Sequence, residues 1–62
     1  MLVSYVTFVQ AVPHRGGMKL TLHMDVDGVE LDARDAFLVI REPGEEDMLV
    51  PYGNVRFMRG KR

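Results

Sequence analysis

The stretch AFLVIREPGEEDMLVPYGNVRFMR, residues 36–59, decides the fold class of this 62-residue chain. A continuous apolar run at 37–40 ends at a Pro-Gly pair and an acidic cluster, and a second run at 48–50 ends at another segment containing Pro and Gly. Short apolar runs bounded by turn residues are typical of strands. The stretch therefore predicts a small, strand-rich domain with short loops.

The turn residues in this stretch predict how its strands are joined. Pro43 and Gly44 stand where a type II turn favours them, so we expect such a turn between strands at 36–42 and 48–50. Residues 51–54 fit either a short 3₁₀-like turn between two barrel strands or a tight hairpin centred on Gly53 and Asn54. Both alternatives place Val55 and Phe57 inward.

Working outward, residues 18–26 alternate strictly between apolar and polar side chains, which predicts a half-buried strand. Asp27-Gly28 follows at once, and an Asp-Gly pair between alternating runs is a strong hairpin signal. In the register of that hairpin the apolar residues of the two strands lie opposite one another on one face, and His23 lies opposite Asp32 on the other. The hydrophobic pattern and the turn residues therefore predict the same register. A competing interpretation is a helix at about 29–40 capped by Asp27, because its apolar residues also fit helical spacing.

Residues 2–12 are rich in Val, Tyr, Thr and Phe and predict a further strand. Neither face of this strand is clearly polar, and a strand apolar on both faces is usually covered on both. In a short chain the second cover can come from another subunit. We therefore expect Leu2, Val6 and Phe8 to form a protein contact face.

Composition limits the function classes that remain. The chain has no Cys, so neither a disulfide nor a thiolate zinc site can stabilise it. It has two His and a net charge of −1. A domain this small is marginally stable alone, which favours a homodimer or larger homo-oligomer. The apolar N-terminal segment is too short to span a membrane and lacks a basic leader, so we expect a cytoplasmic protein.

Candidate catalytic and metal-binding residues are few. The acids around Asp25 and Asp27 suggest part of a calcium loop, but the required spacing and ligand number are missing. The predicted pair of His23 and Asp32 could act as a base, but Ser4 is the only serine and lies in another strand. We expect no enzymatic activity, no metal and no cofactor.

The C-terminal segment is basic and offers an alternative function. It contains four cations and no acid, and an aromatic residue precedes it: Tyr52, Arg56, Arg59, Lys61 and Arg62. Cations beside aromatic rings are what small barrels use to bind single strands of RNA or DNA. The ordinary alternative is a frayed basic tail at residues 58–62.

The order of strands ending in LVPYGNVRFMRG resembles small SH3-like and Sm-like barrels, over roughly the C-terminal half of the chain. The resemblance implies a fold and no partner. We expect one all-β domain over residues 1–62, a small antiparallel, strongly bent sheet of about five strands that closes partly into a barrel. The α+β alternative keeps the helix at about 29–40.

For function, we expect a non-enzymatic protein–protein interaction module, a small regulatory or adaptor protein that acts through an edge strand or apolar patch. The alternative is binding of RNA or single-stranded DNA through the basic C-terminal segment. Salt dependence separates the two, because nucleic-acid affinity falls steeply with salt and an apolar contact does not.

Overall fold

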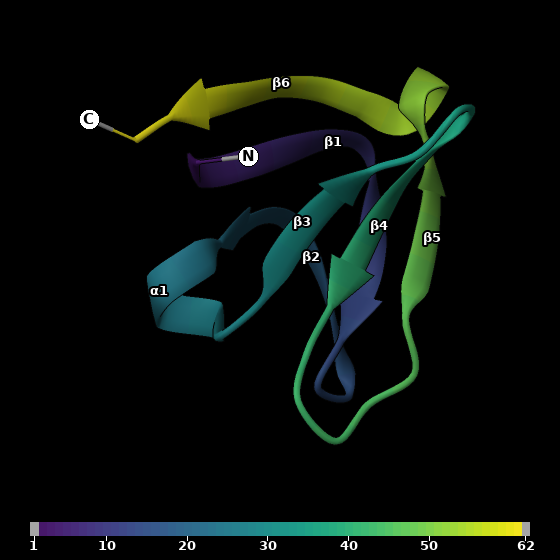
Figure 1. Cartoon of the computed structure of the whole chain (residues 1–62). Coiled ribbons are helices and arrows are strands. Elements are labelled where there is room, and N and C mark those ends of the chain that lie inside the picture. The colour runs from purple at the N-terminus through teal and green to yellow at the C-terminus, as the bar shows by residue number, and fades with distance from the viewer. Residues whose placement is uncertain (1, 62) are drawn as a thin grey trace.

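The computed structural model describes residues 2–61. Within them the elements follow in the order β1 (Val3–His14), β2 (Gly17–His23), α1 (Met24–Asp27), β3 (Glu30–Ala33), β4 (Phe37–Arg41), β5 (Met48–Pro51), η1 (Tyr52–Asn54) and β6 (Val55–Gly60). The strands form two antiparallel three-stranded sheets, in the orders β2-β1-β6 and β3-β4-β5 (Figure 1). The predicted all-β class is confirmed, with two small sheets where one bent sheet was expected.

The long strand β1 is the centre of the first sheet, hydrogen-bonded to β2 on one side and to β6 on the other. Its register with β2 shifts between Thr7 and Val12, and such a bulge bends a strand and increases its twist. At this bend the Asn54 side chain takes the place of a missing strand partner. The Gln10 N–H donates to Asn54 Oδ1 at 2.8 Å, and Asn54 Nδ2 donates to the Gln10 carbonyl at 3.1 Å.

The hydrophobic core contains apolar side chains from both sheets. Its buried members are Val6, Phe8, Val12, Leu22, Val29, Leu38, Ile40 and Val50. The protein contact face predicted from Leu2, Val6 and Phe8 is therefore wrong. Val6 and Phe8 are only 0% and 2% exposed, because their side of β1 faces the core, and Leu2 alone is exposed.

Two of the predicted connections are confirmed. Gly44 has a φ of 83° and the Glu45 N–H donates to the Glu42 carbonyl at 3.1 Å, as a Pro-Gly type II turn requires. Residues 52–54 form the predicted 3₁₀ turn, η1, rather than the alternative hairpin. Val55 packs against the core as expected, but Phe57 is 45% exposed, because it lies on the outer side of β6.

The predicted hairpin at Asp27-Gly28 is wrong. Residues 24–27 form the single helical turn α1, and Gly28 ends it with a left-handed φ of 65°. The strands on either side then enter different sheets, so His23 lies opposite Tyr5, and Asp32 lies opposite Val39. Gly28 supplies the positive φ that the Asp-Gly signal reports, but at a helix C-terminus, where glycine is equally favoured.

Two further expectations need correction. The alternative helix at about 29–40 is wrong, because β3 and β4 occupy most of that range. The predicted frayed tail at residues 58–62 is wrong for residues 58–61, because β6 continues to Gly60 opposite Val3 and the Lys61 N–H donates to the Leu2 carbonyl at 3.2 Å. Arg62 lies outside the described residues.

The left-handed conformation of Gly28 gives a test of α1. We expect Gly28→Ala to lower the free energy of unfolding by about 1–2 kcal/mol, because an L-residue is disfavoured at this φ. The matched control is Gly53→Ala, where φ is not left-handed and a new Cβ meets nothing within 4 Å. Urea unfolding of both variants measures the difference, and equal stabilities would contradict the cap.

Candidate functional site

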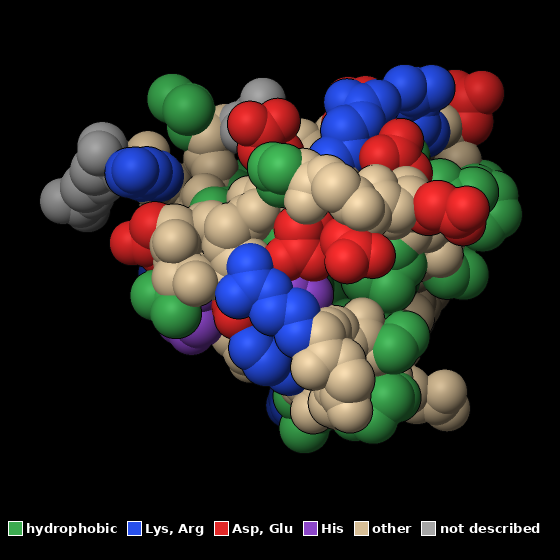
Figure 2. Space-filling model, turned by 90° about the horizontal axis from the view of Figure 1, so that it is seen from below, with side chains coloured by type: hydrophobic (Ala, Val, Ile, Leu, Met, Phe, Trp, Pro, Cys, Tyr) green, Lys and Arg blue, Asp and Glu red, His purple; other side chains and the backbone are tan. Residues whose placement is uncertain are grey.

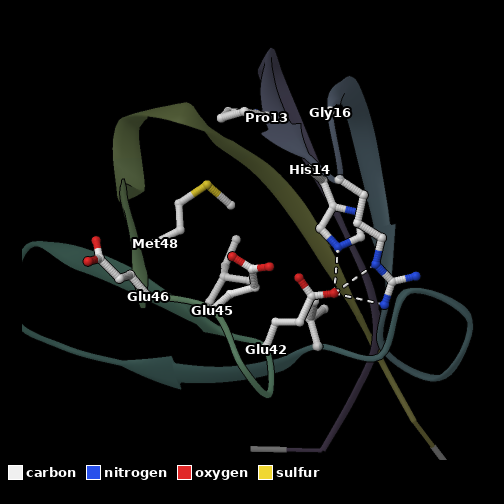
Figure 3. A pocket seen from close by; sticks show the side chains of 10 residues that line it. Pro13, His14, Gly16, Glu42, Glu45, Glu46 and Met48 are labelled. Carbon is white, nitrogen blue, oxygen red and sulfur yellow. Dashed lines mark hydrogen bonds and ion pairs between the residues drawn. The ribbon is translucent and has the colours of Figure 1, made fainter.

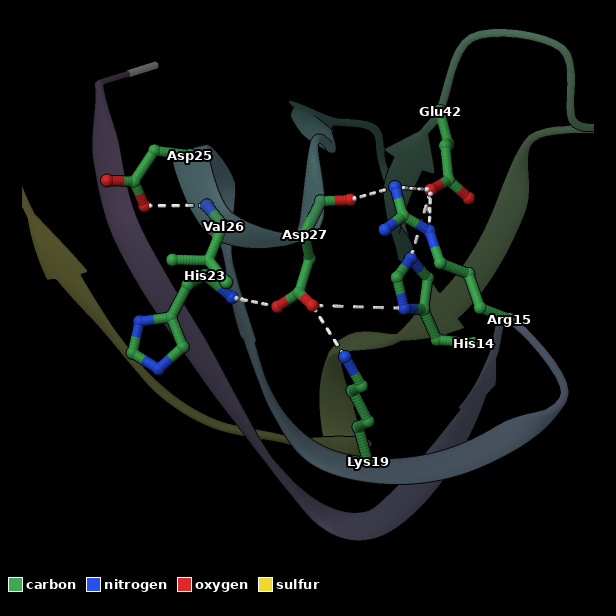
Figure 4. Close-up of polar contacts among 8 residues, drawn as sticks. All are labelled: His14, Arg15, Lys19, His23, Asp25, Val26, Asp27 and Glu42. Atoms are coloured by element: carbon green, nitrogen blue, oxygen red, sulfur yellow. Dashed lines mark hydrogen bonds and ion pairs between the residues drawn. The ribbon is translucent and has the colours of Figure 1, made fainter.

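A cluster of charged residues, with its carboxylates and His14 largely buried and with Arg15 and Lys19 reaching the surface, joins the end of β1 and the start of β2 to α1 and to the residue after β4. Its centre is Asp27, which is 5% exposed. Lys19 Nζ donates to Asp27 Oδ1 at 2.6 Å, and the His23 N–H donates to Oδ2 at 2.8 Å (Figure 4). The hydrogen bond from Lys19 is the main reason that the pKa of Asp27 lies below its ordinary value, and the His23 N–H adds to it.

Glu42 is the second carboxylate of the cluster and contacts the hairpin between β1 and β2. Its Oε1 accepts hydrogen bonds from Arg15 Nε at 2.9 Å and lies 3.1 Å from His14 Nε2. Burial alone raises the pKa of Glu42, but the hydrogen bonds from Arg15 and His14 together outweigh it, so the pKa is lowered. Arg15 Nη2 also donates to the Asp27 carbonyl at 2.9 Å, which links the two carboxylate residues.

His14 lies between the two carboxylates, and its side chain is 4% exposed. Nε2 faces Glu42, and Nδ1 lies 4.0 Å from Asp27 Oδ1, too far for a hydrogen bond. Among the described residues Nδ1 has no hydrogen-bond partner. The cluster thus contains a His-carboxylate pair, but no serine, threonine or cysteine nucleophile contacts that pair in residues 2–61.

A groove of about 310 Å³ opens beside this cluster (Figure 3). Val29, Ile40 and Met48 supply apolar lining, and Glu45 and Glu46 lie along it away from the ion pairs of Glu42. On the same side of the molecule, Lys and Arg side chains lie against acidic side chains and a histidine (Figure 2). The cationic and anionic side chains of the cluster are therefore paired with one another. Such pairing is typical of charged groups that stabilise a fold.

The outer face of β2-β1-β6 carries a different group of side chains. Tyr5 lies opposite His23 on one side and Arg59 on the other, and Thr7 lies opposite Thr21 and Phe57. The Tyr5 and Phe57 rings meet edge to face with centroids 6.0 Å apart, and the Tyr5 and His23 rings are 5.3 Å apart. We call these six residues the aromatic rows.

The outer face of the second sheet is apolar at its β5 edge. Phe37 lies opposite Pro51, and Leu49 lies two residues before Pro51 on the same face of β5. Val9 lines one hollow with Pro51, so an apolar strip of Val9, Phe37, Leu49 and Pro51 runs across this side. Leu49 is 58% exposed and Val9 is 60% exposed.

The structure separates the residues predicted to bind nucleic acid. Arg56 and Arg59 lie in β6 and Lys61 follows it, whereas Tyr52 lies in η1 and packs against the core. Tyr52 therefore does not share a face with Arg59, and Tyr5 and Phe57 occupy that position. The sequence did indicate that Tyr5 and Thr7 lie on the same face of the first strand, because they are two residues apart. No local pattern in the sequence indicates that β1 pairs with β6.

The sequence does not predict the charged cluster. The expected hairpin places Asp27 at a turn, whereas α1 brings it beside His14 and Lys19. Among residues 2–61 no three His, Asp or Glu side chains converge as metal ligands would. The same part of the chain contains no helix long and apolar enough to cross a membrane.

Comparison with known proteins identifies no relative of this chain. No protein-family model matches the chain, and neither the curated proteins nor the solved structures contain a significant match. The assignment of function therefore depends on the surfaces described above.

The charged cluster predicts a pH-dependent stability. We expect Asp27→Asn to lower the free energy of unfolding at pH 7 by about 1.5 kcal/mol, because the carboxylate loses its charge-assisted hydrogen bonds. The folded-state pKa of Asp27 is lowered, so this contribution is complete above about pH 4 and is lost as the pH falls further. The difference between variant and wild type in thermal melts should shrink as the pH falls below about 4.

The matched control is Asp25→Asn on the same helical turn. Asp25 is exposed, and its contact with the Val26 N–H can be kept by an amide oxygen. We expect a change within about 0.5 kcal/mol. A constant gap between Asp27→Asn and wild type from pH 7 to pH 3 would contradict the role given to the charge.

Proposed function

We propose that this protein is a non-enzymatic interaction module that binds protein through the apolar strip of Val9, Phe37, Leu49 and Pro51. The partner is a second copy of the chain. The observation that supports the proposal most is Leu49, a large apolar side chain of the strip that is 58% exposed. Contiguous exposed apolar residues with a polar surround mark interaction surfaces.

The strip has the composition of an interface rather than of ordinary surface. Phe37 is 41% exposed beside Leu49, and an open hollow of about 700 Å³ lies between them and Ala36. Charged side chains flank the strip. Among them, Arg34 and Arg41 both contact Asp32, and Arg41 also contacts Asp47. An apolar centre with a charged rim is the usual arrangement at protein interfaces.

The position of the strip supports self-association. β5 is an outer strand of its sheet, so backbone groups on one side have no partner strand among the described residues. Pro51 cannot donate a hydrogen bond, so pairing along this edge would be short and side-chain contact would dominate. A dimer interface buries about 800 Å² per partner, which is roughly a fifth of the 4420 Å² surface of this chain.

The charged cluster supports a binding role over catalysis. His14 is the buried histidine, and its neighbours Asp27 and Glu42 are both occupied by hydrogen bonds from cationic side chains. Removing Lys19 or Arg15 would leave a largely buried carboxylate without its cationic partner, which is unfavourable. The cluster then stabilises the fold that presents the two outer faces.

Sedimentation equilibrium tests the proposal with one substitution and one control. We expect wild type to have a mass above the 7.1 kDa monomer at concentrations near 100 µM, and Leu49→Glu to be monomeric, because a carboxylate cannot be buried in the contact. The control is Leu20→Glu, on β2 of the other sheet, where the wild-type side chain is 56% exposed. It should leave the mass unchanged.

The salt response distinguishes an apolar contact from a charged one. The mass of wild type should remain the same between 50 mM and 500 mM salt, because apolar contacts are not screened. A wild type that is monomeric at every concentration would overturn the proposal. So would a mass that survives Leu49→Glu but falls with Leu20→Glu.

A further inference from the structure

The two sheets of this protein carry opposite charge. All nine acidic residues lie between positions 25 and 47, and the sequence contains none in 1–24 or 48–62. The acidic interval also contains Arg34 and Arg41, so its formal charge is −9 + 2 = −7, and the two flanking intervals together carry the six other Lys and Arg residues, +6. The net charge of −1 therefore conceals a strong separation.

The fold converts this separation along the chain into a separation in space. β1 and β2 come from the first acid-free interval and β6 comes from the second, and β1 pairs with both. Figure 1 shows β6 running beside β1 at one side of the molecule, with both chain ends on that side. The sheet β2-β1-β6 is thus free of acidic side chains.

The cations of this sheet fall into two groups with different roles. Arg15 and Lys19 are held by Glu42 and Asp27 in the buried cluster. Arg56, Arg59 and Lys61 are exposed, and no ion pair joins any of them to a residue in the part of the chain that the structure describes. Asp25 lines one small hollow with Lys61, and Glu30 lines another.

The aromatic rows lie on the same sheet as these unpaired cations. Phe57 is 45% exposed, Tyr5 is half-buried beside it, and Arg59 Nε lies 3.5 Å from the Tyr5 hydroxyl oxygen. Neighbouring rows on one face of a strand are about 6.7 Å apart, so successive unstacked bases could each meet a ring. Thr7 and Thr21 add hydroxyl groups between the rings and β2.

We propose that the outer face of β2-β1-β6 binds a single strand of nucleic acid, with bases stacked on Tyr5 and Phe57 and phosphates near Arg56, Arg59 and Lys61. Partly exposed aromatic rings and a positive, acid-free edge match the two parts of such a strand. A duplex does not fit, because its bases are already stacked and paired. A protein partner fits the apolar strip better, since Val9, Phe37, Leu49 and Pro51 carry no charge.

This inference goes beyond the interaction module proposed above, and it uses the other sheet. Its failure would leave the association through Leu49 untouched. Conversely, a monomeric wild type would leave the aromatic rows available, so the two proposals are tested separately.

Fluorescence anisotropy with labelled dT12 and U12 oligonucleotides at 50 mM salt tests the face. We expect both strands to bind, and Phe57→Leu to weaken binding roughly 5- to 100-fold, because leucine keeps apolar contact but offers no stacking surface. Phe57→Tyr should retain binding. Thermal melts of both variants show whether each remains folded at the temperature of the assay.

The electrostatic part has its own matched pair. Arg59→Ala should reduce the slope of log affinity against log salt by about 0.7, the value for one phosphate contact on a single strand. Arg34→Ala removes the same charge from the other sheet, at an exposed position after β3, and should leave the slope unchanged. Affinity for U12 against dT12 shows whether the strand bound is RNA or DNA.

Three results would overturn the proposal. One is no binding of either oligonucleotide at 50 mM salt. Another is equal weakening by Arg34→Ala and Arg59→Ala, which would indicate a general charge effect. The third is an affinity for the oligonucleotides that is equal in the folded Phe57→Leu variant and in wild type. If that variant instead changes its sedimentation mass, the face is a protein contact.

Discussion

The bend of β1 is the constraint on which the rest of this structure depends. One strand of twelve residues forms the centre of the first sheet, contributes Val6, Phe8 and Val12 to the core, and ends at the buried His14. Its bulge beyond Thr7 leaves backbone groups without a strand partner, and Asn54 satisfies those of Gln10. A residue from the C-terminal part of the chain thus stabilises the shape of the N-terminal strand.

The charged cluster connects the two sheets at the C-terminal end of β1. Lys19 holds Asp27 at 2.6 Å, and Arg15 and His14 hold Glu42 beside β4. Burying charges is unfavourable unless each is paired, so this cluster fixes one arrangement of the hairpin, α1 and β4 relative to one another. It leaves the outer faces of the two sheets as the surfaces on which a partner can act.

Those two outer faces differ in a way that gives a division of roles. The face of β3-β4-β5 is apolar around Leu49; β3 and β4 come from the acidic interval 25–47, and β5 follows it. The face of β2-β1-β6 is aromatic around Tyr5 and Phe57, and its three strands come from the two acid-free intervals. A module with both proposed activities would associate through one sheet and present positive aromatic surfaces from the other.

The sequence predicted the features that depend on neighbours in the chain. Pro43-Gly44 predicted its turn, residues 51–54 predicted a 3₁₀ turn as one of two alternatives, and the apolar runs predicted β4 and β5. It failed at Asp27-Gly28, because a positive φ at glycine serves a hairpin and a helix C-terminus equally well. The alternation in residues 18–26 predicted a strand that β2 confirms over 18–23, but not its buried face, since Met18 and Leu20 are exposed, and residues 24–26 belong to α1.

What the sequence determined by itself was the all-β class and the separation of charge, since both follow from residue order alone. Only the tertiary structure decided that β1 pairs with β6, that Val6 and Phe8 face inward, and that Tyr5 joins Phe57 and Arg59. Alternation fixes which residues share a face of a strand but not which face is buried. The side that is buried depends on strands distant in the chain, and their pairing leaves no local signal.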